Sequence, residues 1–470
     1  MTSNVAIAVD LFKSKFPGKV ATPDSAEYEA AKTHPWSQTC WTPAAAYIQP
    51  GSAEEVAQSL QIIQQDKCRF AVRTTGHNPN LGFSSADETG VVLDLCRLKS
   101  KELVRGNVAR VGAGNTWREV YSWLEDHQLS AVGGRDQQVG LPGFILGGGL
   151  GAFPNLHGVG ADNVKNFEIA LADGTAVNAN SSENSDLYKA LKGGGSNFGI
   201  ITSVDLETQP LLKVQYTINV YNPEDYTGII NATVKVQNSM ESDPKIGLFT
   251  NFNPGFVAVG LLYADQPTEQ VKAFEPFYKL GSLLSNAIPQ TNGTLLSLAQ
   301  AMGHKQEPKN RAIGTVTTTV SESLYVEVYN TWNETIKDLP AGAVLHYTIQ
   351  PVGKACIQAG KAKGGNVMGL EETPQCWWVF TCEWPKSGEC EDAAAQKAVD
   401  SIVHKVESMA QEKGLLLNFL LPNFAGASQK VLRSYGDGSV QLMKELAAKY
   451  DPESVFQNLQ HGGFLLRNSV

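Results

Sequence analysis

The sequence predicts an α+β fold, and two patterns along the chain indicate it. Helix and strand signals alternate through the first 210 residues. After Gln209-Pro210, residues 211 to about 415 instead combine strand-like segments with one long helix. Strands and then helices in one block predict a large antiparallel sheet that helices cover on one side. At 470 residues the chain is also too long for one ordinary core, so two or three domains are expected.

Capping boxes and short apolar runs define the expected elements of the first 210 residues. Ser52-Ala-Glu-Glu55 and Thr116-Trp-Arg-Glu119 each place a hydroxyl three residues before a glutamate, which is typical of a helix start. The Asp-Gly pair of residues 172–175 is typical of a hairpin turn. Short apolar strands are expected at residues 91–95, 167–171 and 199–204.

The middle of the chain carries longer strand signals and one strong helix signal. A helix is expected over residues 392–413, with Gly414 ending it and with an apolar stripe facing inward, formed by Val399, Ile402, Val403 and Val406. The tail adds a strand and a helix near residues 439–450. We therefore divide the chain into residues 1–210, 211–415 and 416–470. The expected strands of the middle part are residues 214–220, 256–263, 345–350 and 377–384.

Composition excludes several classes of protein. The formal net charge of −9 argues against nucleic-acid binding, which favours a basic face. No apolar run reaches the roughly 18 residues of a membrane helix, and the first residues do not resemble a signal peptide, so a cytoplasmic protein is expected. The seven cysteines form no Cys-x-x-Cys pair, which argues against a structural metal site and favours reduced thiols.

The most unusual segment is residues 131–160, in which 10 of 30 residues are glycine. Glycines at this density allow close approach of backbone to a large planar ligand, and the alternative is a set of tight turns under a packed sheet. Gly147-x-Gly149-x-x-Ala152 superficially matches a dinucleotide fingerprint. That motif requires a helix to begin at the glycines, which residues 153–155 (Phe-Pro-Asn) make improbable.

Several motifs in a fixed order resemble the flavin enzymes of the vanillyl-alcohol-oxidase superfamily, in their berberine-bridge-enzyme-like branch. The resemblance covers the first 210 residues well, the tail fairly well and the middle hardly at all. It implies a PCMH-type FAD-binding domain over about residues 38–211, a substrate domain over 211–415, and a segment 416–470 that returns to the FAD-binding domain. The motifs are Val72-Arg-Thr-Thr-Gly-His-Asn-Pro-Asn80, Val139-Gly-Leu-Pro-Gly-Phe-Ile-Leu-Gly-Gly-Gly149, Lys192-Gly-Gly-Gly-Ser-Asn-Phe-Gly-Ile200 and the ending from Tyr450-Asp-Pro452.

The resemblance implies which residues contact FAD. Consecutive backbone N–H groups after a strand form an anion nest, which suits the pyrophosphate, and the second glycine run can lie against the isoalloxazine ring. The nest and its supporting hydroxyls are Arg73, Thr74, Thr75, Gly76, Asn78 and Ser84. The remaining expected contacts are Gly134, Gly140, Gly143, Gly148, Gly149, Asp162, Gly199, Ile200 and Asn423.

His77 occupies the family position that bonds covalently to the flavin 8-methyl group. A neutral imidazole is nucleophilic near pH 7, so the resemblance implies one histidyl bond to FAD. Relatives with a second, cysteinyl bond carry that cysteine where this chain has Asp136. Val139 lies at the family position beside the ring edge where oxygen reacts, and valine there is associated with access for dioxygen.

The catalytic base is the largest departure from the family. Many relatives carry Tyr-x-Asn-Tyr in the tail, whereas this chain has Leu421-Pro-Asn-Phe424, and a phenyl ring cannot transfer a proton. A base would then come from the middle part, where Tyr347 and Glu383 are the leading candidates beside Tyr263 and His346. The alternation of its strand could point the Tyr347 hydroxyl into a pocket, and burial would raise the pKa of Glu383. Trp377, Trp378, Phe380 and Trp384 suit either an apolar pocket wall or core packing.

The resulting functional hypothesis is an FAD-dependent oxidase. Hydride from an apolar small molecule, such as a secondary metabolite of the kind fungal relatives handle, would pass to flavin N5, and O2 would reoxidise the flavin to give H2O2. The missing tyrosines favour an alternative, an isomerase or cyclase with no net redox turnover. A protein that only binds flavin is a third hypothesis. The sequence indicates neither the substrate nor the oligomeric state.

Overall fold

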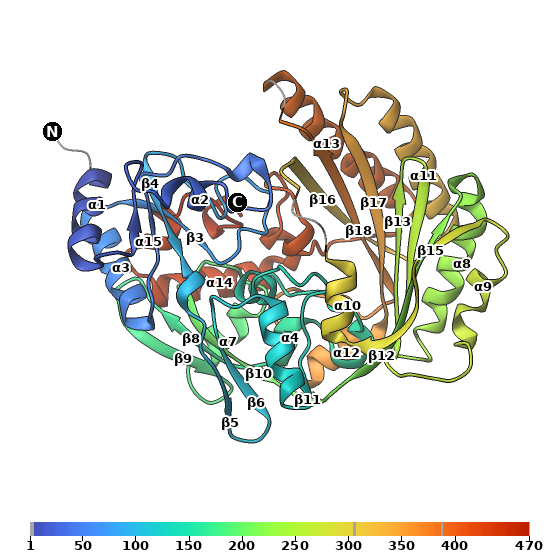
Figure 1. Cartoon of the computed structure of the whole chain (residues 1–470), viewed down its shortest axis with the longest axis horizontal. Coiled ribbons are helices and arrows are strands. Elements are labelled where there is room, and N and C mark those ends of the chain that lie inside the picture. Colours follow the sequence, from blue (N-terminus) through green and yellow to red (C-terminus); the bar gives the residue numbers. More distant parts are fainter. Residues whose placement is uncertain (1–3, 304–306, 387–388, 470) are drawn as a thin grey trace.

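Two small sheets lie at the centre of the N-terminal part of the computed structural model, which describes residues 4–303, 307–386 and 389–469 (Figure 1). The first has the spatial order β1 (Val20–Ala21), β2 (Ala46–Ile48), β4 (Gly90–Asp94), β3 (Arg69–Arg73), and β2, β4 and β3 are parallel. The second is antiparallel, in the order β5 (Lys101–Val104), β6 (Val108–Gly112), β10 (Ile200–Glu207), β8 (Val164–Ala170), β9 (Ala176–Asn180). Because the parallel strands run the same way, the loops after β2, β3 and β4 emerge at one edge.

Helices begin where the capping sequences predict. The Thr116 hydroxyl and the Glu119 carboxylate cap one another's backbone N–H groups at the start of α4 (Trp117–Asp126), so this capping box is confirmed. At α3 (Ala53–Asp66) the Ser52 hydroxyl accepts from the Glu55 N–H, but the Glu55 carboxylate accepts from Gly51 instead of Ser52. The Glu55 carboxylate lies away from the Ser52 N–H, and its Oε1 instead pairs with Lys19 Nζ at 2.6 Å.

An eight-stranded sheet forms the centre of the remaining chain, and every neighbouring pair in it is antiparallel. Helices α8 (Tyr226–Ser239), α11 (Glu322–Thr335) and α13 (Glu389–Glu412) cover one face of it, as the sequence predicts (Figure 1). The spatial order is β15 (Leu283–Thr294), β12 (Lys213–Tyr221), β14 (Phe256–Tyr263), β13 (Ile246–Asn253), β17 (Val344–Val352), β18 (Gln375–Trp384), β16 (Asn310–Thr319), β19 (Leu416–Leu417).

The long helix shows the expected stripe. Val399, Ile402 and Val406 are fully buried against the sheet, and Gly414 has a φ of +66°, a backbone conformation that ends the helix easily only at glycine. The opposite face of the sheet, which we call the inner face, is directed at the N-terminal part. The residues on this inner face are His346, Thr348 and Gln350 of β17 and Trp377, Val379, Thr381 and Glu383 of β18.

The last 50 residues lie against the N-terminal part. After β19 the chain forms α14 (Asp437–Tyr450) and α15 (Val455–Asn458). The Tyr450 hydroxyl donates to Asp186 at 2.8 Å, and the Phe70 N–H of β3 donates to the Leu459 carbonyl at 3.0 Å. These bonds join the two ends of the sequence around the same small sheets.

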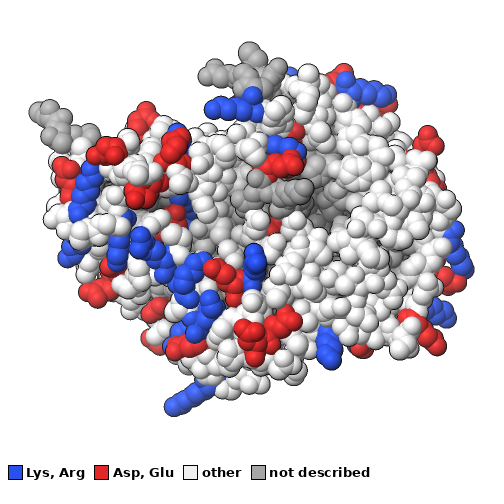
Figure 2. Space-filling model, in the orientation of Figure 1, with Lys and Arg blue, Asp and Glu red and all other residues white. Residues whose placement is uncertain are grey.

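The surface bears charges of both signs. On the face shown in Figure 2, basic and acidic side chains are interspersed over the N-terminal part. In the described part of the chain no helix is long and apolar enough to cross a membrane. Within those same residues no group of three or more histidine, cysteine, aspartate or glutamate side chains could hold a metal ion.

Candidate cofactor and active site

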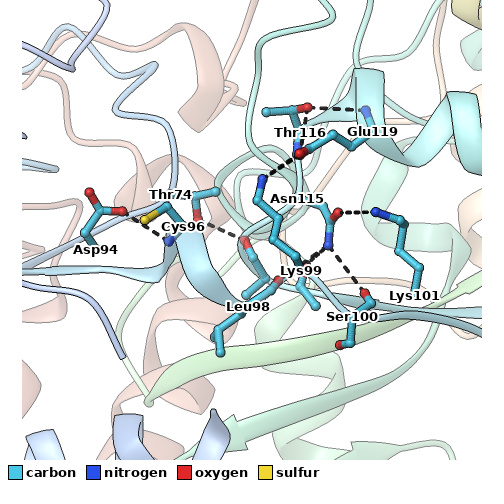
Figure 3. A network of polar contacts seen from close by, with 12 residues as sticks. Thr74, Asp94, Cys96, Leu98, Lys99, Ser100, Lys101, Asn115, Thr116 and Glu119 are labelled. Atoms are coloured by element: carbon cyan, nitrogen blue, oxygen red, sulfur yellow. Dashed lines mark hydrogen bonds and ion pairs between the residues drawn. The ribbon is translucent and has the colours of Figure 1, made fainter. Parts of the chain in front are cut away.

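The expected anion loop follows β3 and is tied closely to its surroundings. Gly76 has a φ of +65°, and a Cβ there would lie 2.9 Å from Pro35 Cα. The Thr74 hydroxyl donates to the Ala113 carbonyl at 3.0 Å, in the polar network of Figure 3. In that network Asn115 donates to the carbonyl oxygens of Leu98 and Ser100. The Thr74 hydroxyl therefore joins the loop to the segment that precedes α4, and Asn115 joins that segment to the turn at residues 98–100.

Arg73 differs from the expectation of a cofactor contact through its side chain. Its guanidinium is buried and donates to one Asp94 oxygen from Nε at 3.2 Å and from Nη2 at 2.6 Å. It also donates to the Ala31 carbonyl at 2.9 Å. Because Asp94 and Ala31 occupy these donors, only the Arg73 backbone belongs to the anion loop.

His77 lies in a stack of three planar groups. Its imidazole is parallel to the Trp36 indole, with ring centroids 4.6 Å apart and an interplanar angle of 6°. The Arg311 guanidinium, from β16 of the large sheet, lies over the same indole, 4.2 Å from its ring centroid. His77 Nε2 is 3.8 Å from Asp136 Oδ2, so the two residues that the resemblance associates with flavin attachment are neighbours.

The glycine-rich segment is close-packed backbone, as its composition suggests. A Cβ at Gly134 would lie 2.9 Å from the Trp117 ring, and one at Gly140 would lie 3.0 Å from Thr74. Gly148 and Gly149 have φ values of +95° and +81°. No helix begins at Gly147–Gly149, since α5 (Leu141–Leu146) ends before them, so the structure agrees with rejecting the dinucleotide fingerprint.

Asn423 fastens the tail to this segment. Its Oδ1 accepts from the Gly149 N–H at 2.9 Å, and its Nδ2 donates to the Gly143 carbonyl at 3.1 Å. A Cβ at Gly147 would lie 2.4 Å from the same amide. The tail asparagine therefore shapes the glycine turn directly, and Phe424 beside it is half-buried.

Asp162, Gly199 and Ile200 lie deeper than the loops. The Asp162 carboxylate accepts from the Val159 N–H at 3.0 Å and from Asn366 at 2.9 Å, and burial raises its pKa. Because protein groups satisfy both of its oxygens, we interpret Asp162 as support for the glycine turn. Gly199 packs so that a Cβ would lie 2.6 Å from the Ala170 carbonyl, and Ile200, which begins β10, is buried.

Buried polar atoms without a partner test whether these residues fit a cofactor. Ser84 Oγ, Trp117 Nε1 and Gln137 Oε1 are buried and have no hydrogen-bond partner within the described residues. Burying such an atom unpaired costs about 1–3 kcal/mol, so a ligand that supplied partners to these three atoms would remove that cost. Gly143 is exposed, and a Cβ there would meet nothing within 4 Å. Unpaired polar atoms in the segments that the resemblance assigns to FAD, together with the open backbone at Gly143, fit a large, planar, polar group such as FAD.

Tyr347 does not line this site, which corrects its assignment as a base. Its ring is fully buried on the helix-covered face of the sheet, stacked on Phe252 with centroids 4.9 Å apart. Its hydroxyl has no partner among the described residues, and burial raises its pKa well above the ordinary value. Because the hydroxyl keeps its proton, Tyr347 cannot act as a base. Trp378, Phe380 and Trp384 share this core, so the core-packing alternative holds for them.

Glu383 lies on the inner face, but its predicted pKa shift was wrong in direction. Burial acts to raise the pKa, yet Arg311, with Nε 2.7 Å from Oε1, and the nearby His346 and Lys309 outweigh it and hold the pKa below its ordinary value. An ion-paired carboxylate is a weak base. Glu383 also lines an open surface cleft of about 490 Å³ together with Lys309 and Val344, so it stands at the outer end of the sheet.

Sequence reasoning missed three residues that the fold brings together here. Trp36 stacks on His77, Arg311 stacks on Trp36, and Arg135 donates from Nη1 to Gln350 Oε1 of β17 at 2.8 Å. On the inner face, Asn251 Nδ2 lies 3.2 Å from His346 Nδ1 and donates to Thr348 Oγ1 at 2.7 Å. The polar residues at alternate positions of 346–350 were the available signal for this face.

Comparison with known proteins gives matches over nearly the whole chain. Residues 44–180 match the FAD binding domain family. An FAD-dependent monooxygenase of Arthrobotrys oligospora is 35% identical over 441 residues, which cover 93% of this chain and 85% of that protein. A match of this extent concerns both the N-terminal part and the large sheet.

Two solved structures share the fold. The 6-hydroxy-D-nicotine oxidase of Arthrobacter nicotinovorans has a TM-score of 0.81 at 20% identity, and the match covers 95% of this chain and 98% of that one. The glucooligosaccharide oxidase of Acremonium strictum, with a 6-S-cysteinyl, 8α-N1-histidyl FAD, has a TM-score of 0.83 at 17% identity. That match covers 97% of this chain and 99% of the oxidase.

Proposed function

Because the chain belongs to the berberine-bridge-like branch of the vanillyl-alcohol-oxidase superfamily and is an FAD-linked oxidoreductase, we propose that it is an oxidase of a largely apolar small molecule. When bound, FAD supplies the hydride acceptor and returns the electrons to O2 as H2O2. The protein's part is to hold the cofactor, to orient the substrate beneath the inner face and to exclude water.

The position of Val139 carries the oxidase proposal. It closes the turn that begins at Asp136, with its N–H donating to the Asp136 carbonyl at 3.3 Å, and it is half-buried. It therefore lies beside the residue that neighbours His77. In the family that the chain resembles, valine at this position is associated with access for dioxygen, which favours an oxidase over a dehydrogenase.

A single covalent bond from His77 is the second part of the proposal. The stack on Trp36 holds the imidazole plane, and the Asp136 carboxylate 3.8 Å from Nε2 favours a proton on that nitrogen. The other ring nitrogen, Nδ1, then carries the lone pair for the bond. Asp136 provides no thiol, so we expect no second bond.

The inner face supports an apolar substrate with few polar contacts. Phe249 and Ile313 on this face are each 9% exposed and Val379 is 7% exposed, beside the polar row of β17. A tyrosine hydroxyl is missing at Phe424, and Tyr347 is in the core, so a substrate that needs no strong base suits the site. The same observation favours the second candidate, an isomerase or cyclase that leaves FAD oxidised.

Oxygen consumption under ¹⁸O2 distinguishes these functions once a substrate is found by screening. An oxidase forms one H2O2 per product and places no ¹⁸O in the product. Incorporation of ¹⁸O with water as the second product would instead establish a monooxygenase, the activity named for the Arthrobotrys relative. Repeated turnover without oxygen, with the flavin absorbance unchanged, would establish the isomerase or cyclase and overturn the oxidase proposal.

A further inference from the structure

Arg135 projects from the glycine-rich segment to the large sheet. It lies between Gly134, whose carbonyl accepts from the Tyr121 hydroxyl at 2.9 Å, and Asp136, the neighbour of His77. Its guanidinium Nη1 donates to Gln350 Oε1 on the inner face at 2.8 Å. We propose that Arg135 and Gln350 form a binding site for one anionic oxygen group, such as a carboxylate, on an otherwise apolar substrate.

Comparison with two other arginines shows that Arg135 lacks the counter-charge that they have. Arg73 has Asp94 at 2.6 Å and Arg311 has Glu383 at 2.7 Å, and both arginines are buried. Arg135 is half-buried and forms no ion pair within residues 4–303, 307–386 and 389–469, and burial lowers its pKa to about 10. A cation that is partly removed from water without a counter-charge pays part of the cost of desolvation, and an arriving anion offsets that cost.

The hydrogen-bonding capacity of Arg135 fits such a ligand. A guanidinium has five N–H donors in a plane, and Gln350 takes one, so a planar fork remains for two parallel bonds to a carboxylate. The Gln350 amide holds the fork in one orientation without neutralising its charge. This proposal rests on the proposed function only in that the site adjoins bound FAD.

Benzoate is a suitable probe because its carboxylate carries an apolar ring, and benzamide is its neutral counterpart. Titration of the FAD-loaded enzyme is followed by the perturbation of the flavin absorbance. We expect benzoate to bind the wild type about 10–100-fold more tightly than benzamide, the range of a charge-assisted hydrogen bond. Arg135→Met should remove this preference, and Arg135→Lys should restore part of it. The matched control is Arg118→Met, which removes an exposed arginine of α4.

Gln350→Glu is a second test that keeps Arg135 and adds an internal counter-ion. We expect it to abolish the preference for benzoate while the protein stays folded and yellow. Equal binding of benzoate and benzamide by the yellow wild type would overturn the anion site and leave the oxidase proposal intact. If Arg135→Met lowers the flavin midpoint potential while benzoate binding is unchanged, the positive charge of Arg135 stabilises the reduced flavin and does not bind a substrate anion. The proposal then fails.

Discussion

Nε2 of His77 and Oδ2 of Asp136 lie 3.8 Å apart, although 58 positions separate the two residues in the sequence. A histidine and a cysteine that both bond one flavin must be neighbours of this kind. In this chain the second position carries a carboxylate, which can orient the imidazole but cannot bond the ring carbon. The pair therefore predicts that His77 forms a covalent bond to the flavin and that position 136 forms none.

The first test concerns the histidyl bond. We expect the purified wild type to stay yellow after acid precipitation and to fluoresce on a denaturing gel, because a covalent bond survives unfolding. His77→Ala should lose the fluorescent band while still binding FAD reversibly. Free flavin in the acid supernatant of the wild type would show that the bond is not formed.

The second test restores the missing attachment. In the double variant His77→Ala, Asp136→Cys, we expect the flavin to be bound covalently again, because a thiol at position 136 occupies the family's second attachment position. Gel fluorescence and the mass of the flavin peptide measure the result. Asp136→Ser in the same background is the control, and covalent flavin in that control would exclude the thiol as the cause.

The third test concerns the Trp36 indole. Removal of a stacked aromatic pair costs about 0.5–1.5 kcal/mol beyond lost burial, so Trp36→Ala should slow covalent incorporation of added FAD severalfold. Trp36→Phe should retain more of the rate. Trp123→Ala is the matched control. Trp123 of α4 also contacts a histidine, because its ring centroid lies 4.8 Å from that of His127, which follows the helix. An equal effect of both alanine variants would mean a general loss of stability.

The fourth test concerns the tyrosine that the sequence suggested as a base. Tyr347→Phe removes a buried hydroxyl that has no partner in the described structure. We therefore expect the free energy of unfolding to rise by about 1 kcal/mol and the turnover rate to stay within a few-fold of the wild type. Phe424→Tyr should likewise leave turnover within a few-fold. A loss of turnover of about 10²-fold in Tyr347→Phe would return Tyr347 to a catalytic role.

The fifth test uses pH. The folded-state pKa of Glu383 is held below its ordinary value, so its ion pair stabilises the fold above the unfolded-state pKa, and this contribution is lost as pH falls through the folded-state pKa. Glu383→Gln should lower the free energy of unfolding by about 1–3 kcal/mol at pH 7. The difference from wild type should shrink in acid. Denaturant unfolding at several pH values measures it, and a difference independent of pH would contradict the ion-pair account.

Local patterns predicted the elements well, and distant contacts decided the site. The capping box at Thr116, the stripe of α13 and the strand β14 follow from neighbouring residues, and they stand where expected. Tyr347 was placed on the wrong face because alternation fixes which residues share a face but not which face is the core. An aromatic ring with a polar tip suits either side.

The contacts of Arg135 and Trp36 could not be predicted from the sequence for a different reason. Arg135 meets Gln350 and Trp36 meets Arg311, and in each pair the two residues lie more than 200 positions apart. No period or spacing connects such residues. The direction of the Glu383 pKa shift was missed in the same way, because Arg311 on the adjacent strand is not its neighbour in sequence.

The stack of His77, Trp36 and Arg311 also sets an order of maturation. The first two rings come from the beginning of the chain, and the third group comes from β16, which pairs with β18 in the large sheet. The contact of Arg311 with the Trp36 ring is therefore complete only when these later-synthesised strands are in place. Permanent attachment of the flavin would then mark chains that have finished folding, and truncated or misassembled chains would remain colourless once dialysed.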